Sequence, residues 1–219
     1  MTGVAPILIV DDHPLVAVAL TTALREQGLD VERIDPAADG SLDAGLARAR
    51  SGLVVLDLDL GRDATGAGID GAELVAAIRS RGWTVLLLTG SVDRQRVAGA
   101  VAAGALGWLP KNLPFEEIVD TVSGAAHGRQ VFDAQRRDAL VAEHHAARSA
   151  RSDLDRRWAR LTPREREVLD CLVEGKRVAD VARQFVVAEG TVRTQVRSIL
   201  AKLEVRSQLE AVALARLVR

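Results

Sequence analysis

Hydrophobic residues in the first 128 positions gather into short runs separated by longer amphipathic stretches. The runs lie near 7–11, 30–34, 53–57, 84–88 and 105–109. Short apolar runs between helical segments are typical of buried parallel strands. The intervening stretches are therefore predicted to be helices, at 14–27, 42–50, 72–81, 92–103 and 114–127. Strand and helix units in this alternation predict a doubly wound α/β domain over 1–128 with right-handed crossovers.

The first predicted helix shows the amphipathic pattern well. Leu15, Val18, Ala19 and Leu24 fall on one side of it, so we expect that side to face the sheet.

The remaining residues show no strand-like run. Residues 129–158 are rich in alanine, arginine and acids, and 135–158 contains no proline or glycine. We therefore expect a helical, solvent-exposed linker, with a dimerisation helix as the alternative. Residues 159–219 are predicted to form a small all-α domain of four helices. Thr162, Pro163 and Glu165 give its first helix a cap, a first-turn proline and a capping box.

Polar residues follow four of the predicted strands directly. The acidic pair Asp11-Asp12 ends the first run, Asp57 the third, Thr89 the fourth and Lys111 the fifth. In an open parallel sheet, chemistry gathers outside the carboxyl ends of the strands. Carboxylates, a hydroxyl and an ammonium would therefore meet in one crevice, a set that suits a divalent metal and a phosphoryl group.

These residue types suggest roles in phosphoryl transfer. A carboxylate can accept a phosphoryl group as an acyl phosphate, and Asp57 closes an unbroken apolar run, so it is the expected nucleophile. Asp59 lies in the loop that follows, where its backbone carbonyl is the expected metal ligand. Mg²⁺ prefers carboxylates, carbonyls and water. Lys111 supplies a point charge, and the Thr89 hydroxyl can bond a phosphoryl oxygen only once the phosphoryl group is present.

Residues 1–128 resemble a response-regulator receiver domain. The residues that match its pattern are the acidic pair Asp11-Asp12, the phosphoacceptor Asp57, the switch hydroxyl of Thr89 and Lys111. The resemblance implies a flavodoxin-like sheet of strand order 2-1-3-4-5, and it places Trp108 at the aromatic switch position, usually Tyr or Phe. The loop over 58–71 departs from the pattern, since it is longer, glycine-rich and without proline. We interpret it as a tolerated surface insertion, with altered kinase docking or metal access as the alternative. His13 is expected to be a loop residue and not a ligand.

The predicted helix beginning near Thr191 has two faces. Its outward face is expected to carry Arg193, Thr194, Arg197 and Ser198, with Gln195 beside them. A short helix over 178–184, a turn and then a helix with a basic face form a helix-turn-helix pattern. Arginine in a major groove can pair both acceptors of guanine.

Residues 160–219 resemble the LuxR-type helix-turn-helix domain, on Leu161–Leu169, Gly175, Glu189–Thr194 and Ile199–Leu203. The resemblance implies that Arg193, Thr194 and Arg197 approach bases, whereas Gln195 and Lys202 touch phosphates. Ala188 replaces the serine that usually caps the recognition helix, a change that costs about 1 kcal/mol of helix stability.

The length of 219 residues allows one large domain or two modest ones, and the composition is that of a folded protein. Hydrophobic residues make up 48% and charged residues 27% of the 219 positions. No apolar run approaches the roughly 20 residues that span a bilayer, and the start lacks a basic, cleavable signal, so we expect a cytoplasmic protein without membrane insertion. Residues 1–128 hold 10 basic and 17 acidic side chains (−7), and 129–219 hold 19 and 13 (+6), which together give the net −1. The basic half is the candidate for nucleic acid.

Taken together, the two halves resemble a NarL/LuxR-type two-component response regulator. The resemblance implies a sensor histidine kinase and promoter DNA as partners, Mg²⁺ as cofactor, and a homodimer on activation. Phosphoryl transfer to Asp57, with Asp11, Asp12 and the Asp59 carbonyl at the metal, would promote dimerisation and promoter binding. One alternative is a regulator that works unphosphorylated. A less favoured one is a haloacid-dehalogenase-type phosphatase; we expect a regulator and not an enzyme.

Overall fold

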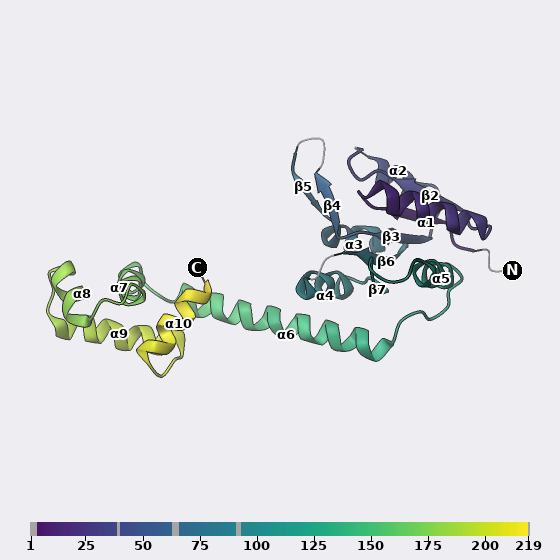
Figure 1. Cartoon of the computed structure of the whole chain (residues 1–219). Helices are drawn as coiled ribbons and strands as arrows, with labels where there is room; N and C mark the ends of the chain where they lie inside the picture. The colour runs from purple at the N-terminus through teal and green to yellow at the C-terminus, as the bar shows by residue number, and fades with distance from the viewer. Residues whose placement is uncertain (1–3, 39, 63–65, 91–92, 219) are drawn as a thin grey trace. The chain divides into compact units, whose positions relative to one another are not determined.

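The computed structural model describes residues 4–38, 40–62, 66–90 and 93–218. The chain divides into two compact units, 1–145 and 146–219, and the division falls within one long helix, α6 (Ala134–Ala159; Figure 1). Each unit is described by itself below.

The first unit is built on a five-stranded parallel sheet. Its strands are β1 (Ile7–Val10), β2 (Val31–Ile34), β3 (Leu53–Leu56), β6 (Thr84–Thr89) and β7 (Gly107–Pro110), in the order β2-β1-β3-β6-β7. β4 and β5 pair with each other outside this sheet, so β6 and β7 are its fourth and fifth strands in chain order. The order therefore confirms the predicted 2-1-3-4-5 topology. The central strands are apolar throughout since both faces of the sheet are covered.

Helices cover both faces of this sheet. They are α1 (Pro14–Glu26), α2 (Ser41–Ala47), α3 (Gly71–Ser80), α4 (Arg94–Ala102) and α5 (Phe115–Ala126). Buried residues of α1 and α5 share one core with alternate strand residues, and those of α2, α3 and α4 share the other. All five predicted helices are therefore present, with ends that differ from the prediction by at most three residues. Val92, in the fourth prediction, lies outside the described residues.

Part of 58–71, which we described from the sequence as a loop, forms two strands. Asp59–Arg62 (β4) and Gly68–Asp70 (β5) pair antiparallel and form a hairpin (Figure 1). Residues 63–65 lie outside the described residues. The strands carry little of the apolar alternation by which strands are recognised, because only Leu60 is fully buried. Asp59, which we placed in a loop, is the first residue of β4.

The predicted buried face of the first helix was also wrong. Leu15 and Val18 are 87% and 51% exposed, whereas α1 buries Ala17, Leu20 and Leu24 against the sheet. Ala17, Leu20 and Leu24 repeat at helical spacing, whereas Leu24 follows Leu15 by about two and a half turns and so lies on the opposite side of the helix. The small Ala17 packs against the sheet, and the larger Leu15 and Val18 face solvent.

The long helix α6 is present where a helical linker was predicted, but its first part is not fully solvent-exposed. Leu140 is 2% exposed and packs into the core beneath α4, together with Trp108 and Val141. Glu143 forms an ion pair of 2.8 Å with Arg94 at the start of α4. The early turns of α6 therefore belong to the receiver-like unit.

The second unit is all-helical, as predicted. Its helices after α6 are α7 (Pro163–Val173), α8 (Val178–Phe185), α9 (Glu189–Leu203) and α10 (Gln208–Val218). Their buried apolar residues form one core, against which Trp158 of α6 packs. The Thr162–Glu165 capping box is formed in both directions, at 3.2 and 2.7 Å. Of the helices that the structure describes, none is both long and apolar enough to cross a bilayer.

Candidate phosphoacceptor site and recognition helix

The strand-end residues meet at one edge of the sheet. Asp11 follows β1, Asp57 follows β3, Thr89 ends β6 and Lys111 follows β7. The strands are parallel and in register, so their carboxyl ends lie side by side. Asp11, Asp57 and Thr89 are each only 2% exposed. Polar and charged residues are rarely buried so deeply unless they are paired or serve a function.

Lys111 joins the two buried carboxylates. Its Nζ lies 2.6 Å from Oδ2 of Asp57 and 2.8 Å from Oδ2 of Asp11. Burial raises the pKa of the Asp57 carboxyl, an effect that the hydrogen bond from Lys111 only partly offsets. Burial also opposes the charge on Lys111, but hydrogen bonds to Asp11 and Asp57 outweigh it and raise the pKa of the ammonium. A charged lysine therefore faces the carboxylate pair.

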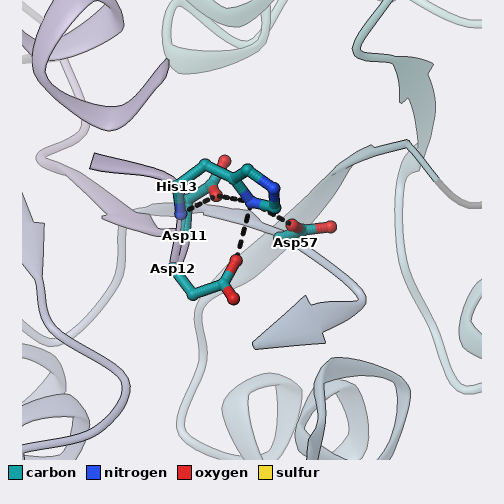
Figure 2. A group of neighbouring side chains, drawn as sticks. All are labelled: Asp11, Asp12, His13 and Asp57. Atoms are coloured by element: carbon teal, nitrogen blue, oxygen red, sulfur yellow. Dashed lines mark hydrogen bonds and ion pairs between the residues drawn. The ribbon is translucent and has the colours of Figure 1, made fainter. Parts of the chain in front are cut away.

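His13 lies closer to this site than the sequence indicated. It is the N-cap residue of α1, and its ring turns toward the acidic residues (Figure 2). Nδ1 of His13 is 2.7 Å from Oδ1 of Asp12, 3.3 Å from Oδ1 of Asp11 and 3.7 Å from Oδ2 of Asp57. Its position directly after the acidic pair was the one signal in the sequence that could have placed it here.

The acidic residues are arranged as a divalent cation would require. One ligand atom each from Asp11, Asp12, His13 and Asp57 lies within 4.8 Å of the others. Both oxygens of the buried Asp11 carboxylate lie close to the Lys111 ammonium, at 2.9 Å for Oδ1 and 2.8 Å for Oδ2. Hard carboxylate oxygens in such a cluster fit Mg²⁺.

A cavity of about 390 Å³ lies away from this cluster, between α2 and α3, and one of about 320 Å³ lies beside Thr89. The second is lined by Thr89, Arg94, Val97, Trp108, Pro110, Arg136 and Leu140. Trp108 is half-buried, and the guanidinium carbon of Arg136 lies 5.2 Å from its ring centroid. Thr89 and Trp108, the two predicted switch residues, therefore border one cavity.

The recognition helix α9 exposes three of the predicted DNA contacts. Arg193, Thr194 and Arg197 are exposed on one face, while Val192 and Ile199 are buried on the other. Arg193 makes a 3.1 Å ion pair with Glu189 one turn earlier. Ala188 provides no side-chain cap, as expected.

Three other polar residues of α9, Gln195, Ser198 and Lys202, are partly buried. Ser198 and Lys202 turn toward Glu165 of α7: Oγ of Ser198 lies 2.6 Å from Oε1, and Nζ of Lys202 lies 2.6 Å from Oε2. The placement of Ser198 on the outward face was therefore wrong. Gln195 is half-buried, and its Oε1 has no hydrogen-bond partner among the described residues.

Glu165 is buried and charged. Burial opposes its ionisation, but hydrogen bonds from Lys202, Ser198 and Thr162 together outweigh that effect and lower the pKa of Glu165 to about 2. Sequence reasoning gave Glu165 only a capping role. Its contact with α9 spans 37 positions, and such a distant contact leaves no periodic signal in the sequence.

Known families match both units. Residues 7–123 match the response regulator receiver domain, and residues 159–215 match the bacterial regulatory proteins of the luxR family. The nitrate/nitrite response regulator NarL of Escherichia coli K12 is 28% identical over 210 residues, which cover 94% of this chain and 93% of NarL. The transcriptional regulatory protein LiaR of Bacillus subtilis is 30% identical over 212 residues, 95% of each chain. A solved structure of full-length FixJ from B. japonicum is 25% identical, with a TM-score of 0.46, and covers 97% of this chain and 96% of FixJ.

The fold and the acidic cluster thus define a receiver domain joined to a helix-turn-helix domain. The chain belongs to the two-component response regulators with a LuxR-type DNA-binding domain. These are transcription regulators and not enzymes, which excludes the phosphatase alternative.

Proposed function

We propose that phosphoryl transfer to Asp57 controls DNA binding by this response regulator. In this proposal 1–128 is the phosphoacceptor domain, 129–158 the helical linker and 159–219 the DNA-binding domain. One observation carries it: the Asp57 carboxylate is buried at the end of the central strand, 2.6 Å from the Lys111 ammonium. A buried carboxylate beside a fixed cation fits a nucleophile whose product carries further negative charge.

The transfer begins with a sensor histidine kinase or a small phosphodonor. An oxygen of Asp57 bonds to phosphorus while the bond from phosphorus to the donor breaks. For a phosphohistidine donor the leaving ring nitrogen keeps the electron pair, and Asp57 becomes an acyl phosphate. Lys111 then faces the new phosphoryl oxygens as a point charge.

Mg²⁺ is the proposed cofactor. The carboxylates of Asp12 and Asp57 and the backbone carbonyl of Asp59 would hold it, with Asp11 in support. When bound, the ion neutralises charge on the transferring oxygens. The clustering of carboxylate oxygens from Asp11, Asp12 and Asp57 within 4.8 Å of one another supports a cation here.

Thr89 and Trp108 are the proposed switch residues. The Thr89 hydroxyl would bond a phosphoryl oxygen, and the Trp108 ring would follow it inward, biasing a two-state equilibrium. The cavity of about 320 Å³ that both residues border supports this, because it leaves room for the ring to move.

A homodimer is the proposed active state. Leu15 and Val18 of α1 and Phe115 of α5 are 87%, 51% and 45% exposed, on two helices that contact each other. Large exposed apolar side chains favour burial in an interface with a second copy of the chain. In a symmetric dimer, two recognition helices can then bind two half-sites.

On promoter DNA, Arg193, Thr194 and Arg197 are the proposed base contacts, and Gln195 and Lys202 the proposed phosphate contacts. An ammonium has three N–H donors, so Lys202 can keep its bonds to Glu165 and still offer a donor to a phosphate. Phosphate contacts position the helix, whereas base contacts give specificity.

Mass spectrometry and light scattering test the proposal on the full chain. The wild-type protein should gain one phosphoryl mass with a small phosphodonor and Mg²⁺, and should shift from monomer to dimer with beryllofluoride, an acyl-phosphate mimic. Asp57→Asn should lose both responses, whereas Asp43→Asn, which changes an exposed carboxylate of α2, should keep them. Label on Asp57→Asn at the wild-type rate would contradict the site. Dimerisation without phosphoryl mimic would favour the regulator that works unphosphorylated.

A further inference from the structure

The β4–β5 hairpin begins and ends against the proposed phosphoacceptor. β4 starts at Asp59, two residues after Asp57, and β5 ends at Asp70, the N-cap residue of α3. Gly71 follows, and a Cβ there would lie 2.0 Å from the carbonyl oxygen of Asp57. Only a glycine permits this close return of the chain.

A single side chain of α4 holds both ends of the hairpin. Nη1 of Arg96 lies 2.6 Å from Oδ1 of Asp59, and Nη2 lies 2.9 Å from Oδ1 of Asp70. Nη2 also donates to the carbonyl oxygen of Leu58 at 2.9 Å. The planar guanidinium carries five donors in fixed directions, so it can bridge acceptors that a lysine ammonium cannot join in the same way.

This contact reaches Asp57 through one peptide unit. The carbonyl of Leu58 and the N–H of Asp59 belong to the same planar peptide bond. That N–H donates to Oδ1 of Asp57 at 3.3 Å, while the carbonyl also accepts from the N–H of Gly71 at 3.0 Å. Arg96 therefore fixes the plane of the peptide that bonds the carboxylate, and it ties the Asp59 side chain to α4.

We propose that Arg96 is a positioning residue for divalent-cation binding beside Asp57. The inference rests on the proposed function, in which Asp57 and the Asp59 carbonyl bind the ion. Arg96 acts through the Leu58–Asp59 peptide and does not touch the cation. Its charge alone would have the opposite effect, because a cation near the site repels Mg²⁺, and removing it would tighten binding. The direction of the change therefore separates positioning from simple electrostatics.

The test is a titration of the full chain with Mg²⁺ alone, followed by tryptophan fluorescence. Arg96→Gln should bind Mg²⁺ about tenfold more weakly, the loss expected when a residue that orients a metal ligand is removed. Arg96→Lys should also bind more weakly, since it restores the charge without the bridge. Arg94→Gln is the matched control: it removes the same charge from the first turn of α4, where Arg94 pairs with Glu143, and should leave the affinity unchanged.

Unchanged or tighter Mg²⁺ binding by Arg96→Gln would overturn the inference. Circular dichroism at the titration temperature shows whether each variant is folded. If Arg96→Gln is unfolded, Arg96→Lys takes its place in the test. Failure of the proposed function looks different: the wild-type protein would then not bind Mg²⁺, or Asp57→Asn would bind it equally well.

Discussion

The phosphoacceptor cluster and the recognition helix differ in how deeply their charged side chains are buried and in how far apart in sequence their ionic partners lie. In the cluster, the side chains of Asp57 and Lys111 are 1% and 14% exposed and come from positions 54 apart in sequence. On α9, the Arg193 side chain is 64% exposed, and its ionic partner Glu189 lies one turn away on the same helix. Charges inside a protein interact strongly, whereas exposed charges are screened by water and salt.

This difference predicts how each region responds to substitution. Buried charges that share partners are coupled, so removing one changes the state of the others. Exposed side chains on one helix contribute nearly independently. We therefore expect single substitutions to disable the cluster but only to weaken the recognition helix.

The largest effect is expected for Lys111→Met. The variant removes the ammonium that lies against Asp57 and Asp11, so negative charge on a phosphoryl group there would lose its fixed counter-charge. The initial rate of phosphorylation by a small phosphodonor should fall roughly a hundredfold, as when one preorganised donor is removed from an active site.

The chain offers a matched control for this variant. Lys176→Met removes a partly exposed lysine of the second unit, which pairs with Glu174, and should phosphorylate normally. A wild-type rate in Lys111→Met would show that the buried cluster is less coupled than its geometry indicates.

Glu165→Gln should produce the next largest effect, on stability. It keeps the side-chain length but removes the charge that Lys202 and Ser198 contact, at a cost of about 2 kcal/mol in the free energy of unfolding of the second unit. Hydrogen exchange of α7 and α9 amides measures this change. Glu167→Gln is the control, because its own side chain is 55% exposed and its ion pair with Arg164 is open to solvent screening.

The same glutamate predicts a pH dependence. The pKa of Glu165 is lowered from 4.5 to about 2 in the folded protein, so its stabilising contribution is complete above pH 4.5. As the pH falls from 4.5 toward 2, protonation removes that contribution. The stability difference between wild type and Glu165→Gln should therefore shrink over this window. A difference that does not change with pH would mean that the ionised form of Glu165 is not what stabilises the unit.

Arg197→Ala should have a graded effect on DNA binding. Loss of one bidentate base contact costs about 1–3 kcal/mol, so the affinity for promoter DNA should fall about ten- to a hundredfold while phosphorylation is unchanged. Fluorescence anisotropy on a DNA fragment selected by the wild-type protein measures this. Arg148→Ala, an exposed arginine of α6, is the control. An equal loss on unrelated DNA would instead assign Arg197 to phosphate contact.

The two regions also differ in what their sequence reveals. Strand ends follow from where apolar runs stop, so Asp57 and Lys111 could be placed at one edge of the sheet from the sequence alone. The boundaries of α9 and its basic face follow from helical spacing, a local property. The roles of Arg96 and Glu165 depend on which distant segments pack against them, and no local pattern encodes that.

The wrong predictions also concern features that depend on contacts with distant segments. The hairpin was missed because Asp59–Arg62 lacks alternating apolar residues, and its ends are held by Arg96 of α4 instead. The buried face of α1 was misjudged because size favoured Leu15 over Ala17, while close packing against the sheet selected the smaller side chain. Ser198 fits the polar face of α9 by spacing, yet a buried acceptor on α7 draws it inward.

The smallest expected effect is a gain, at the turn before α9. Val186 ends α8 in the left-handed region, with φ of 55° and an exposure of 91%, so a β-branched residue occupies a strained backbone without burying its side chain. Val186→Asn should raise the free energy of unfolding by about 1 kcal/mol, because asparagine tolerates this conformation. Thermal unfolding of the full chain measures it.

Glu204→Asn tests the same backbone geometry at the end of α9, where φ is 57°. Glu204 pairs with Arg157 and Arg160, so the loss of these contacts should offset the gain there. If Val186→Asn gains stability but loses affinity for DNA, the strained valine serves the recognition surface. A loss of stability would mean that the turn is not strained, and that exposed positions beside α9 are as tightly constrained as the buried cluster.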